Sequence, residues 1–190
     1  MPSVFDVLGH DHEEVKQMLA ELEAGRTAAT GASGSDLAQR KKLVEQLVIE
    51  ESKHEAVEEM YFWPAVRDAI PDGGRLADTA IQQEQEAKEV LDKLDKLDAS
   101  EPEFEQLVTT IIQAGRGHIN YEETQVWPQL RTALSAQEAG DLGDKIEQAK
   151  KTAPTRPHPH TPASPAALKT AGPAVAAADR ARDAASGRGE

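Results

Sequence analysis

The chain has 190 residues, of which 38% are hydrophobic, a formal net charge of −13 and no cysteine. This length fits one domain with an extension, and the apolar fraction suffices for a folded core. The lack of cysteine excludes disulfides, thiolate metal sites and a cysteine nucleophile, and the acidic balance argues against nucleic-acid binding. No apolar run approaches the roughly 18 residues of a membrane span, and the first residues do not resemble a secretory signal. We therefore expect a soluble cytoplasmic protein that does not bind membranes and whose folded part is not a general nucleic-acid binder.

Apolar side chains at steps of three and four predict long helices, and no convincing alternating strand pattern occurs. The four expected helices cover residues 4–23, 36–63, 75–98 and 103–127. Pro102 suits the first turn of the fourth helix. Ser135 and Glu138 have the spacing of a capping box, which predicts a short fifth helix to about residue 150. The predicted fold is all-α, an up-down antiparallel four-helix bundle with this short fifth helix.

The composition changes near residue 152. Residues 153–190 contain six prolines and twelve alanines, and their only large apolar side chains are Leu168 and Val175. Five basic and three acidic residues give this segment a charge of +2, which leaves −15 for residues 1–152. So few apolar groups cannot offset the entropy lost on ordering. We expect a bundle domain over 1–151 and a disordered Ala/Pro-rich tail over 152–190. The tail either solubilises the protein or contacts a nucleic acid or a protein partner through its arginines.

Two segments of the second and fourth predicted helices repeat each other. Residues 54–70 read HEAVEEMYFWPAVRDAI, and residues 118–134 read HINYEETQVWPQLRTAL. Seven of the 17 aligned positions are identical, and the shared pattern begins H-x3-E-E-x3-W-P. A weaker match between the first and third helices aligns His12 with Glu84. The chain therefore reads as two helix pairs with a pseudo-symmetric site between them.

Titratable side chains fall on the apolar faces of these helices, several of them as His/Glu pairs four residues apart, which share one helix face. The set comprises His12, His54, Glu58, Glu84, His118 and Glu122. In a bundle these faces point inward, so three imidazoles and three carboxylates would share one interior layer. An unpaired buried carboxylate costs on the order of several kcal/mol, and no lysine or arginine falls on the same faces at that level. Bound cations are the simplest compensation.

Nitrogen and oxygen ligands without sulfur suit iron or manganese and tolerate zinc. We predict that Glu58 and Glu122, on opposite helices, bridge two metal ions. His54 and His118 would bind one ion each, and the first and third helices would complete the two ends. Six protein side chains leave room for an oxo, hydroxo or exogenous ligand.

Neighbouring residues have weaker claims on the site. Glu55 could reach a metal if its helix were rotated, whereas His10 should be solvated. Tyr61 falls one turn after the first bridging glutamate, and it is the candidate catalytic residue if its hydroxyl hydrogen-bonds a metal-bound oxygen species. Trp63 and Trp127 precede prolines that would kink or end the helices, and we expect both to pack at the end of the bundle.

The segments that carry these residues resemble hemerythrin-like proteins of the HHE cation-binding type. The motifs are GHDHEEVKQML, HEAVEEMYFWPAV, EQEAKEVLDKL and HINYEETQVWPQL, which span about residues 3–134. The resemblance implies a four-helix bundle around two non-haem iron ions with an oxo or hydroxo bridge, manganese or zinc being alternatives. It also implies a protein that binds, senses or handles O2, nitric oxide, peroxide or iron.

The third helix departs from the family pattern. The family has a histidine where this chain has Glu84, with Gln83 or water as the alternative near the metal, and the second histidine of the oxygen carriers falls at Ala80. A carboxylate in place of a neutral donor should favour ferric iron, so reversible O2 carriage is not expected. The leading hypothesis is therefore a diiron protein that reacts with peroxide, O2 or nitric oxide, with catalase-like peroxide removal in oxidative or nitrosative stress as its candidate activity. The alternatives are an iron- or oxygen-sensing module that signals through a partner without turnover, and a metal-free helical interaction domain.

Overall fold

The computed structural model describes residues 2–161 and 164–188, and its regular elements there are helical. They are α1 (Val4–Ala24), the 3-10 turn η1 (Ala28–Thr30), α2 (Gly34–Val57), η2 (Glu58–Phe62), α3 (Trp63–Ala69), α4 (Gly73–Leu94), α5 (Pro102–Tyr121), η3 (Glu122–Val126), α6 (Trp127–Ala133), α7 (Ala136–Lys150) and α8 (Pro165–Ser186). The all-α fold class is thereby confirmed. Within the described ranges, none of the helices combines the length and the apolar character that a membrane crossing requires.

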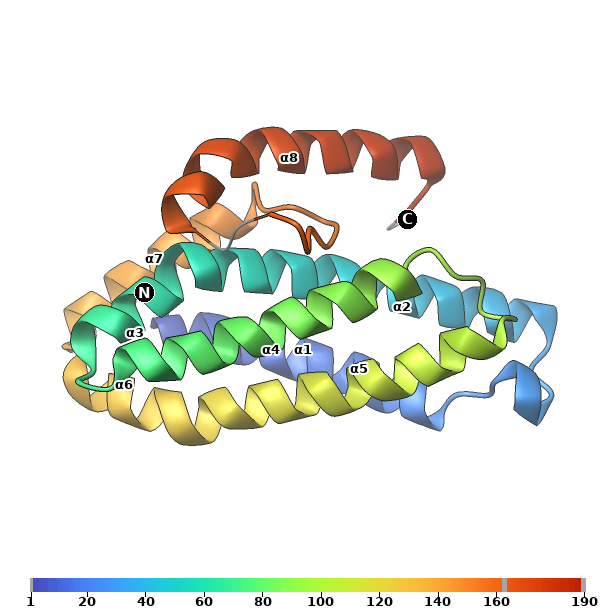
Figure 1. Ribbon diagram of the computed structural model, residues 1–190, viewed down its shortest axis with the longest axis horizontal. Coiled ribbons are helices and arrows are strands. Elements are labelled where there is room, and N and C mark those ends of the chain that lie inside the picture. The colour runs from blue at the N-terminus through green and yellow to red at the C-terminus, as the bar shows by residue number, and fades with distance from the viewer. Residues whose placement is uncertain (1, 162–163, 189–190) are drawn as a thin grey trace.

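The four long helices α1, α2, α4 and α5 lie side by side, and successive ones run in alternating directions (Figure 1). α1 contacts α2 and α5, and α4 contacts the same two helices, so the four form a closed ring. α7 packs against α1 and α2 at one end. α5 begins at Pro102 as predicted. The capping box predicted at Ser135 is also confirmed. The Ser135 hydroxyl accepts a hydrogen bond from the backbone amide of Glu138, and the Glu138 carboxylate accepts one from the backbone amide of Ser135.

The two sequence repeats share an irregular backbone. Glu58 and Glu122 each begin a π-helical turn of five residues, which the Trp-Pro pair follows. Proline lacks an N–H and clashes with the carbonyl four residues before it, and a π turn relieves this conflict because its amides bond one residue further back. The amide of Trp63 accordingly bonds to the Glu58 carbonyl, and that of Trp127 to Glu122. The prolines therefore do not end the helices, which continue as α3 and α6.

The apolar core consists of two clusters on either side of a polar layer. One cluster lies at the Trp63 end of the molecule, and the other lies toward the α1–α2 connection. Along α1 the first cluster ends at Leu8 and the second begins at Val15, with His12 buried between them. The same order occurs on α4 around the buried Glu84. The polar layer is thus shielded from water at both ends.

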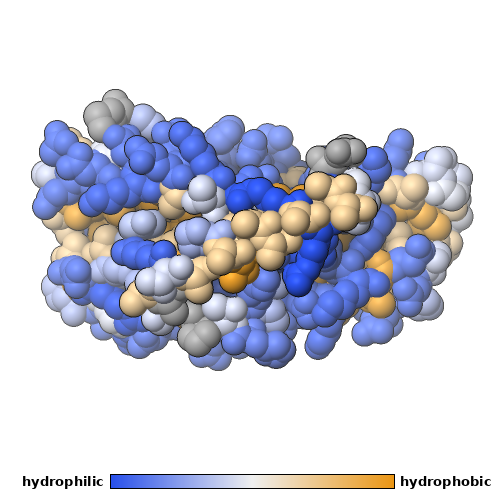
Figure 2. Space-filling model, turned by 90° about the horizontal axis from the view of Figure 1, so that it is seen from above, coloured by the Kyte–Doolittle hydropathy of each residue, from blue (hydrophilic) through white to orange (hydrophobic). Residues whose placement is uncertain are grey.

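The C-terminal segment differs from the predicted disordered tail. Helix α8 packs on η2, and its buried residues recur at steps of four and three along one face: Leu168, Gly172, Ala176, Asp179 and Asp183. Figure 2 looks onto α8, whose alanine-rich outer surface crosses a largely hydrophilic face. Residues 162–163 and 189–190 of the predicted tail lie outside the described residues, and the domain boundary near residue 151 stays a prediction.

Ion pairs supply the stabilisation that the sparse apolar side chains of this segment lack. Arg156 and Arg188 each bind both Asp183 of α8 and Asp95 at the end of α4. Asp179 is fully buried and lies 2.9 Å from His158 Nε2. The prediction of disorder counted large apolar side chains only, and it missed charged pairs whose partners are far apart in sequence.

Candidate metal centre

All six residues predicted as ligands meet in the polar layer. Each comes from a different element, and they are His12 of α1, His54 of α2, Glu58 of η2, Glu84 of α4, His118 of α5 and Glu122 of η3. The most exposed of these side chains, that of His118, is only 12% accessible. The helical register therefore brings six sequence-distant polar groups into one buried site.

The ligand atoms form two overlapping groups, and in each group one atom from every residue lies within 4.8 Å of the others. The first group is His12, His54, Glu58 and Glu122, and the second is Glu58, Glu84, His118 and Glu122. The two shared residues are the glutamates predicted to bridge. The arrangement offers four side chains to each of two neighbouring cations.

Many polar atoms in this layer make no hydrogen bond within the described part of the chain. They are the Nε2 atoms of His12, His54 and His118, both carboxylate oxygens of Glu58 and Glu122, and one oxygen of Glu84. Buried polar atoms are normally satisfied, and each exception needs an explanation. These atoms are metal-ligand types and converge on the same space, so the residues present fit a pair of bound cations.

The electrostatics of the metal-free layer are unfavourable. Burial, together with the charges of Glu122 and Glu84, raises the pKa of Glu58 well above its ordinary value. Burial also raises the pKa of Glu84 strongly, against the opposing effect of Lys88. Cations in the layer would remove this penalty, because they stabilise the ionised carboxylates and displace their protons.

Glu122 lies between two imidazoles. Its two oxygens are 3.3 Å from His12 Nε2 and 2.9 Å from His118 Nε2, which are ion-pair contacts without the geometry of a hydrogen bond. Burial acts to raise the pKa of Glu122, but His118 and His12 outweigh it and lower the pKa below its usual range. The same contacts raise the pKa of both histidines against the effect of their burial. Without metal, this carboxylate is therefore the anionic member of the layer.

A second set of residues contacts the outer nitrogens of the three imidazoles. The sequence did not predict this orienting role for any of them. Three side-chain oxygens lie within 3.0–3.2 Å of these Nδ1 atoms: Glu123 at His12, Asp11 at His54 and Gln83 at His118. Such contacts fix the ring orientation and tautomer, so that Nε2 points to the metal. Lysines in turn bind the two carboxylates, with Lys16 on Glu123 and Lys150 on Asp11.

The two tryptophans contribute to the site itself, whereas we expected them only to pack at the end of the bundle. Trp63 Nε1 donates a hydrogen bond to Glu84. The Trp127 ring stacks on the His12 imidazole, with centroids 4.9 Å apart and an interplanar angle of 13°. The repeated Trp-Pro pair was the signal that could have found them, since each tryptophan follows a bridging glutamate at the same interval.

The remaining candidates lie outside the two groups. His10 is solvated as predicted, with a side chain 73% exposed. Glu55 is buried, but it is not a member of either group. The Tyr61 ring faces α8, where Lys169 Nζ lies 4.4 Å from its centroid, and neither of the two ligand groups found among the described residues includes it. The predicted catalytic role of Tyr61 therefore gains no support from its position.

Comparisons with known proteins agree with this site. Residues 3–130 match the family model described as the hemerythrin HHE cation binding domain. An uncharacterized hemerythrin-like protein of Schizosaccharomyces pombe is 26% identical over 184 residues, covering 96% of this chain and 86% of the relative. A crystal structure of a hemerythrin HHE cation binding domain-containing protein from Mycobacterium kansasii has the same fold, with a TM-score of 0.65 and 20% identity over 94% of this chain and 99% of that one. The chain belongs to the hemerythrin HHE cation-binding family.

Proposed function

We propose that the chain is a non-haem diiron protein whose ligands are the six residues of the polar layer. The observation that carries the proposal is the convergence of buried, unsatisfied imidazole nitrogens and carboxylate oxygens in two groups that share Glu58 and Glu122. The donors are nitrogen and oxygen without sulfur, a set that suits iron. The three carboxylates carry a charge of −3 when ionised, which two divalent cations together with one hydroxide would balance.

We further propose that the protein reacts with small oxygen or nitrogen species, with peroxide removal as its activity. Bound iron would supply the redox change and a coordination position for the small ligand. Disproportionation of two H2O2 to O2 and two H2O needs no external reductant, so it requires no docking surface for a redox protein. A carboxylate at position 84 supports this reading over reversible O2 carriage, because it stabilises the higher oxidation state.

The chain's own residues prepare the site for this chemistry. Asp11, Glu123 and Gln83 hold the imidazole rings in place. The two apolar clusters restrict water at both ends of the layer, which strengthens electrostatic interactions inside it. Trp63 holds one oxygen of Glu84, leaving the other oxygen for a metal.

Metal analysis and peroxide turnover test the proposal. Purified protein loaded with iron should contain about two iron ions per chain, show the optical bands of a diferric centre and evolve O2 from peroxide. His54→Ala should lose iron and turnover, whereas His10→Ala, which alters an exposed histidine, should lose neither. Iron-free wild-type protein after loading, or unchanged turnover in His54→Ala, would refute the proposal.

A sensor that does not turn over peroxide is the second candidate function, and the position of η2 favours it. This π turn supplies Glu58 to the centre and also supports α8. Metal binding could therefore change how firmly α8 is held and so signal to a partner. Amide hydrogen exchange of residues 165–186, measured with and without iron, tests this candidate. A change in exchange rate on iron loading, in a protein that does not turn over peroxide, supports the sensor. Identical exchange rates in the two forms exclude it.

A further inference from the structure

A cavity of about 250 Å³ adjoins the metal centre between α2, α4 and α5. Its wall includes Glu84 and His118, which belong to the second ligand group. Its wall also includes Glu86 and Gly117, which are exposed, so the cavity reaches the surface. The cavity thus joins solvent to one side of the proposed diiron site.

The wall of this cavity is acidic. Four glutamates line it, and no lysine or arginine among the described residues does. Glu51 and Glu55 lie one turn apart on α2 and are only 9% and 2% exposed. One carboxylate oxygen of Glu55 makes no hydrogen bond to any described residue. Two largely buried carboxylates therefore lie in the wall of a cavity that a cation can enter, and the burial of their charge is costly unless a cation compensates for it.

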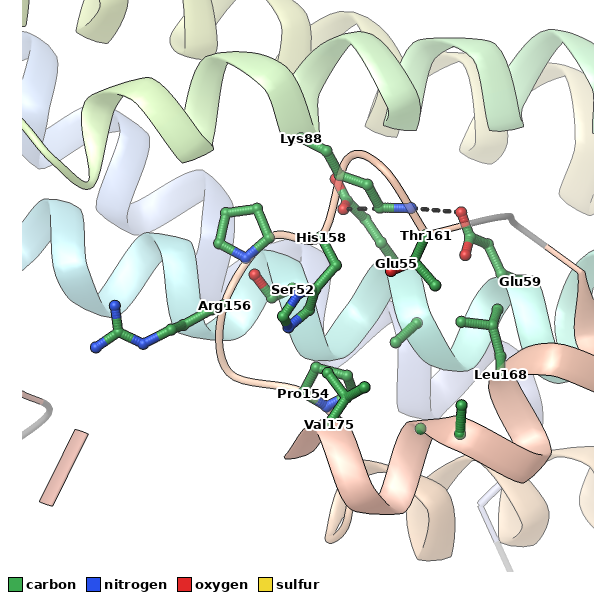
Figure 3. A pocket seen from close by; sticks show the side chains of 14 residues that line it. Ser52, Glu55, Glu59, Lys88, Pro154, Arg156, His158, Thr161, Leu168 and Val175 are labelled. Atoms are coloured by element: carbon green, nitrogen blue, oxygen red, sulfur yellow. Dashed lines mark hydrogen bonds and ion pairs between the residues drawn. The ribbon is translucent and has the colours of Figure 1, made fainter. Parts of the chain in front are cut away.

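Lys88 neutralises these carboxylates only in part, because two glutamates share it. Its ammonium group binds Glu59 and also forms an ion pair with Glu55, 4.0 Å from Oε2 (Figure 3). Lys88 lines a different, smaller cavity, whose wall also includes His158 and side chains of α8 (Figure 3). One lysine thus faces two glutamates there, and Glu51 has no cation beside it in the wall of the larger cavity.

We propose that this cavity is the entry route for divalent metal ions, and that Glu51 and Glu55 hold an incoming ion before it passes to Glu84. The inference rests on the proposed function, because it presupposes that the layer takes up metal. Carboxylates are hard oxygen ligands for such cations, and a cleft lined by one sign of charge concentrates the opposite ion. Glu84 lies on the cavity wall and in the centre, so it connects the transient site to the final one.

Metal loading of the full-length chain, first depleted of metal with a chelator, tests the route. The probe is Co2+, whose uptake is followed by its visible absorption in a stopped-flow instrument. We expect the double variant E51Q/E55Q to load at least about tenfold more slowly at low salt, within the range by which acidic clefts accelerate cation association. Its final stoichiometry and spectrum should match the wild type. The matched control is Glu50→Gln, which alters a neighbouring glutamate that lies outside the cavity and is paired with Lys53.

A second variant narrows the route without removing charge. A side chain at Gly117 would have open space, since a Cβ there meets nothing within 4 Å. Gly117→Leu should therefore fold and slow loading, whereas Gly34→Leu, at an equally open position at the start of α2, should not. Wild-type loading rates in E51Q/E55Q, or in Gly117→Leu, would overturn the inference, as would fewer bound ions in E51Q/E55Q. Failure of the wild type itself to bind Co2+ or iron would instead refute the proposed function.

Discussion

Replacing Glu58 by glutamine should stabilise the metal-free protein and weaken its response to metal. Both carboxylate oxygens of Glu58 are buried without a hydrogen-bond partner in the described part of the chain, although His54 Nε2 lies 3.3 Å from one of them. An uncompensated buried charge costs about 3–5 kcal/mol, and an unpaired buried amide costs about 1–3 kcal/mol. The exchange should therefore recover roughly 2 kcal/mol at pH 8. In a protein of this size that corresponds to a rise of about 4–8 °C in the unfolding temperature.

The sign of the pH dependence follows from the raised pKa of Glu58. In the metal-free protein this carboxyl is more readily protonated when folded than when unfolded, where its pKa is near the ordinary 4.5. Its contribution to stability is therefore complete below that pH and is lost as the pH rises through the folded pKa. The advantage of Glu58→Gln should accordingly vanish near pH 4.5 and grow toward pH 8.

Thermal unfolding with and without metal provides the assay, and Glu59→Gln is the matched control. Glu59 is also buried, but Lys88 pairs with it, so its loss should lower the unfolding temperature in both forms. The unfolding temperature of the wild type should rise markedly when metal is added, and that of Glu58→Gln should rise much less. A lower unfolding temperature of metal-free Glu58→Gln at pH 8, or a stabilisation of this variant by metal as large as that of the wild type, would refute the prediction.

Three further substitutions test the surroundings of the site. Asp11→Asn should reduce metal affinity about 10- to 100-fold, because His54 loses its anionic partner; competition with a chelator measures this, and unchanged affinity would contradict the orienting role. Trp63→Phe removes the hydrogen-bond donor to Glu84 while keeping the aromatic bulk, so the optical spectrum of the iron-loaded protein should shift while its iron content persists; an identical spectrum would mean that the contact has no effect on the centre. Asp179→Ala should speed amide exchange in α8 but not in the four long helices, and equal protection in α8 would show that this buried carboxylate does not hold the segment.

Spacing within single helices predicted much of the architecture. The apolar repeats located the long helices, and the duplicated His/Glu pairs identified residues that the structure brings together. These features depend on side chains three and four residues apart, which share a face in any regular α-helix. The alignment of the two halves of the sequence predicted His12 and Glu84 as ligands. In the structure, the two halves correspond to two overlapping ligand groups.

Contacts between distant segments and departures from regular helix geometry could not be predicted from the sequence. Asp11 adjoins His12 in the sequence but contacts His54 on another helix, a pairing that only the packing of α1 on α2 defines. Tyr61 was placed on the inner face by assuming 3.6 residues per turn, and the π turn invalidates that assumption. The order of α8 depends on buried aspartates and arginines, residue types that sequence composition associates with solvent.

The π turns explain why each repeat can carry a proline in the middle of a helix. Nine positions separate His54 from Trp63, and the same interval separates His118 from Trp127. Such a turn is in effect an α-helix with one inserted residue, which the wider turn absorbs locally. Deleting Met60 would let the Trp63 amide bond the same Glu58 carbonyl in a regular α-helix, so Trp63 would still face Glu84, but the clash of Pro64 with the preceding turn would return. Sequences that align here with a one-residue gap should therefore keep the tryptophan and lack the proline.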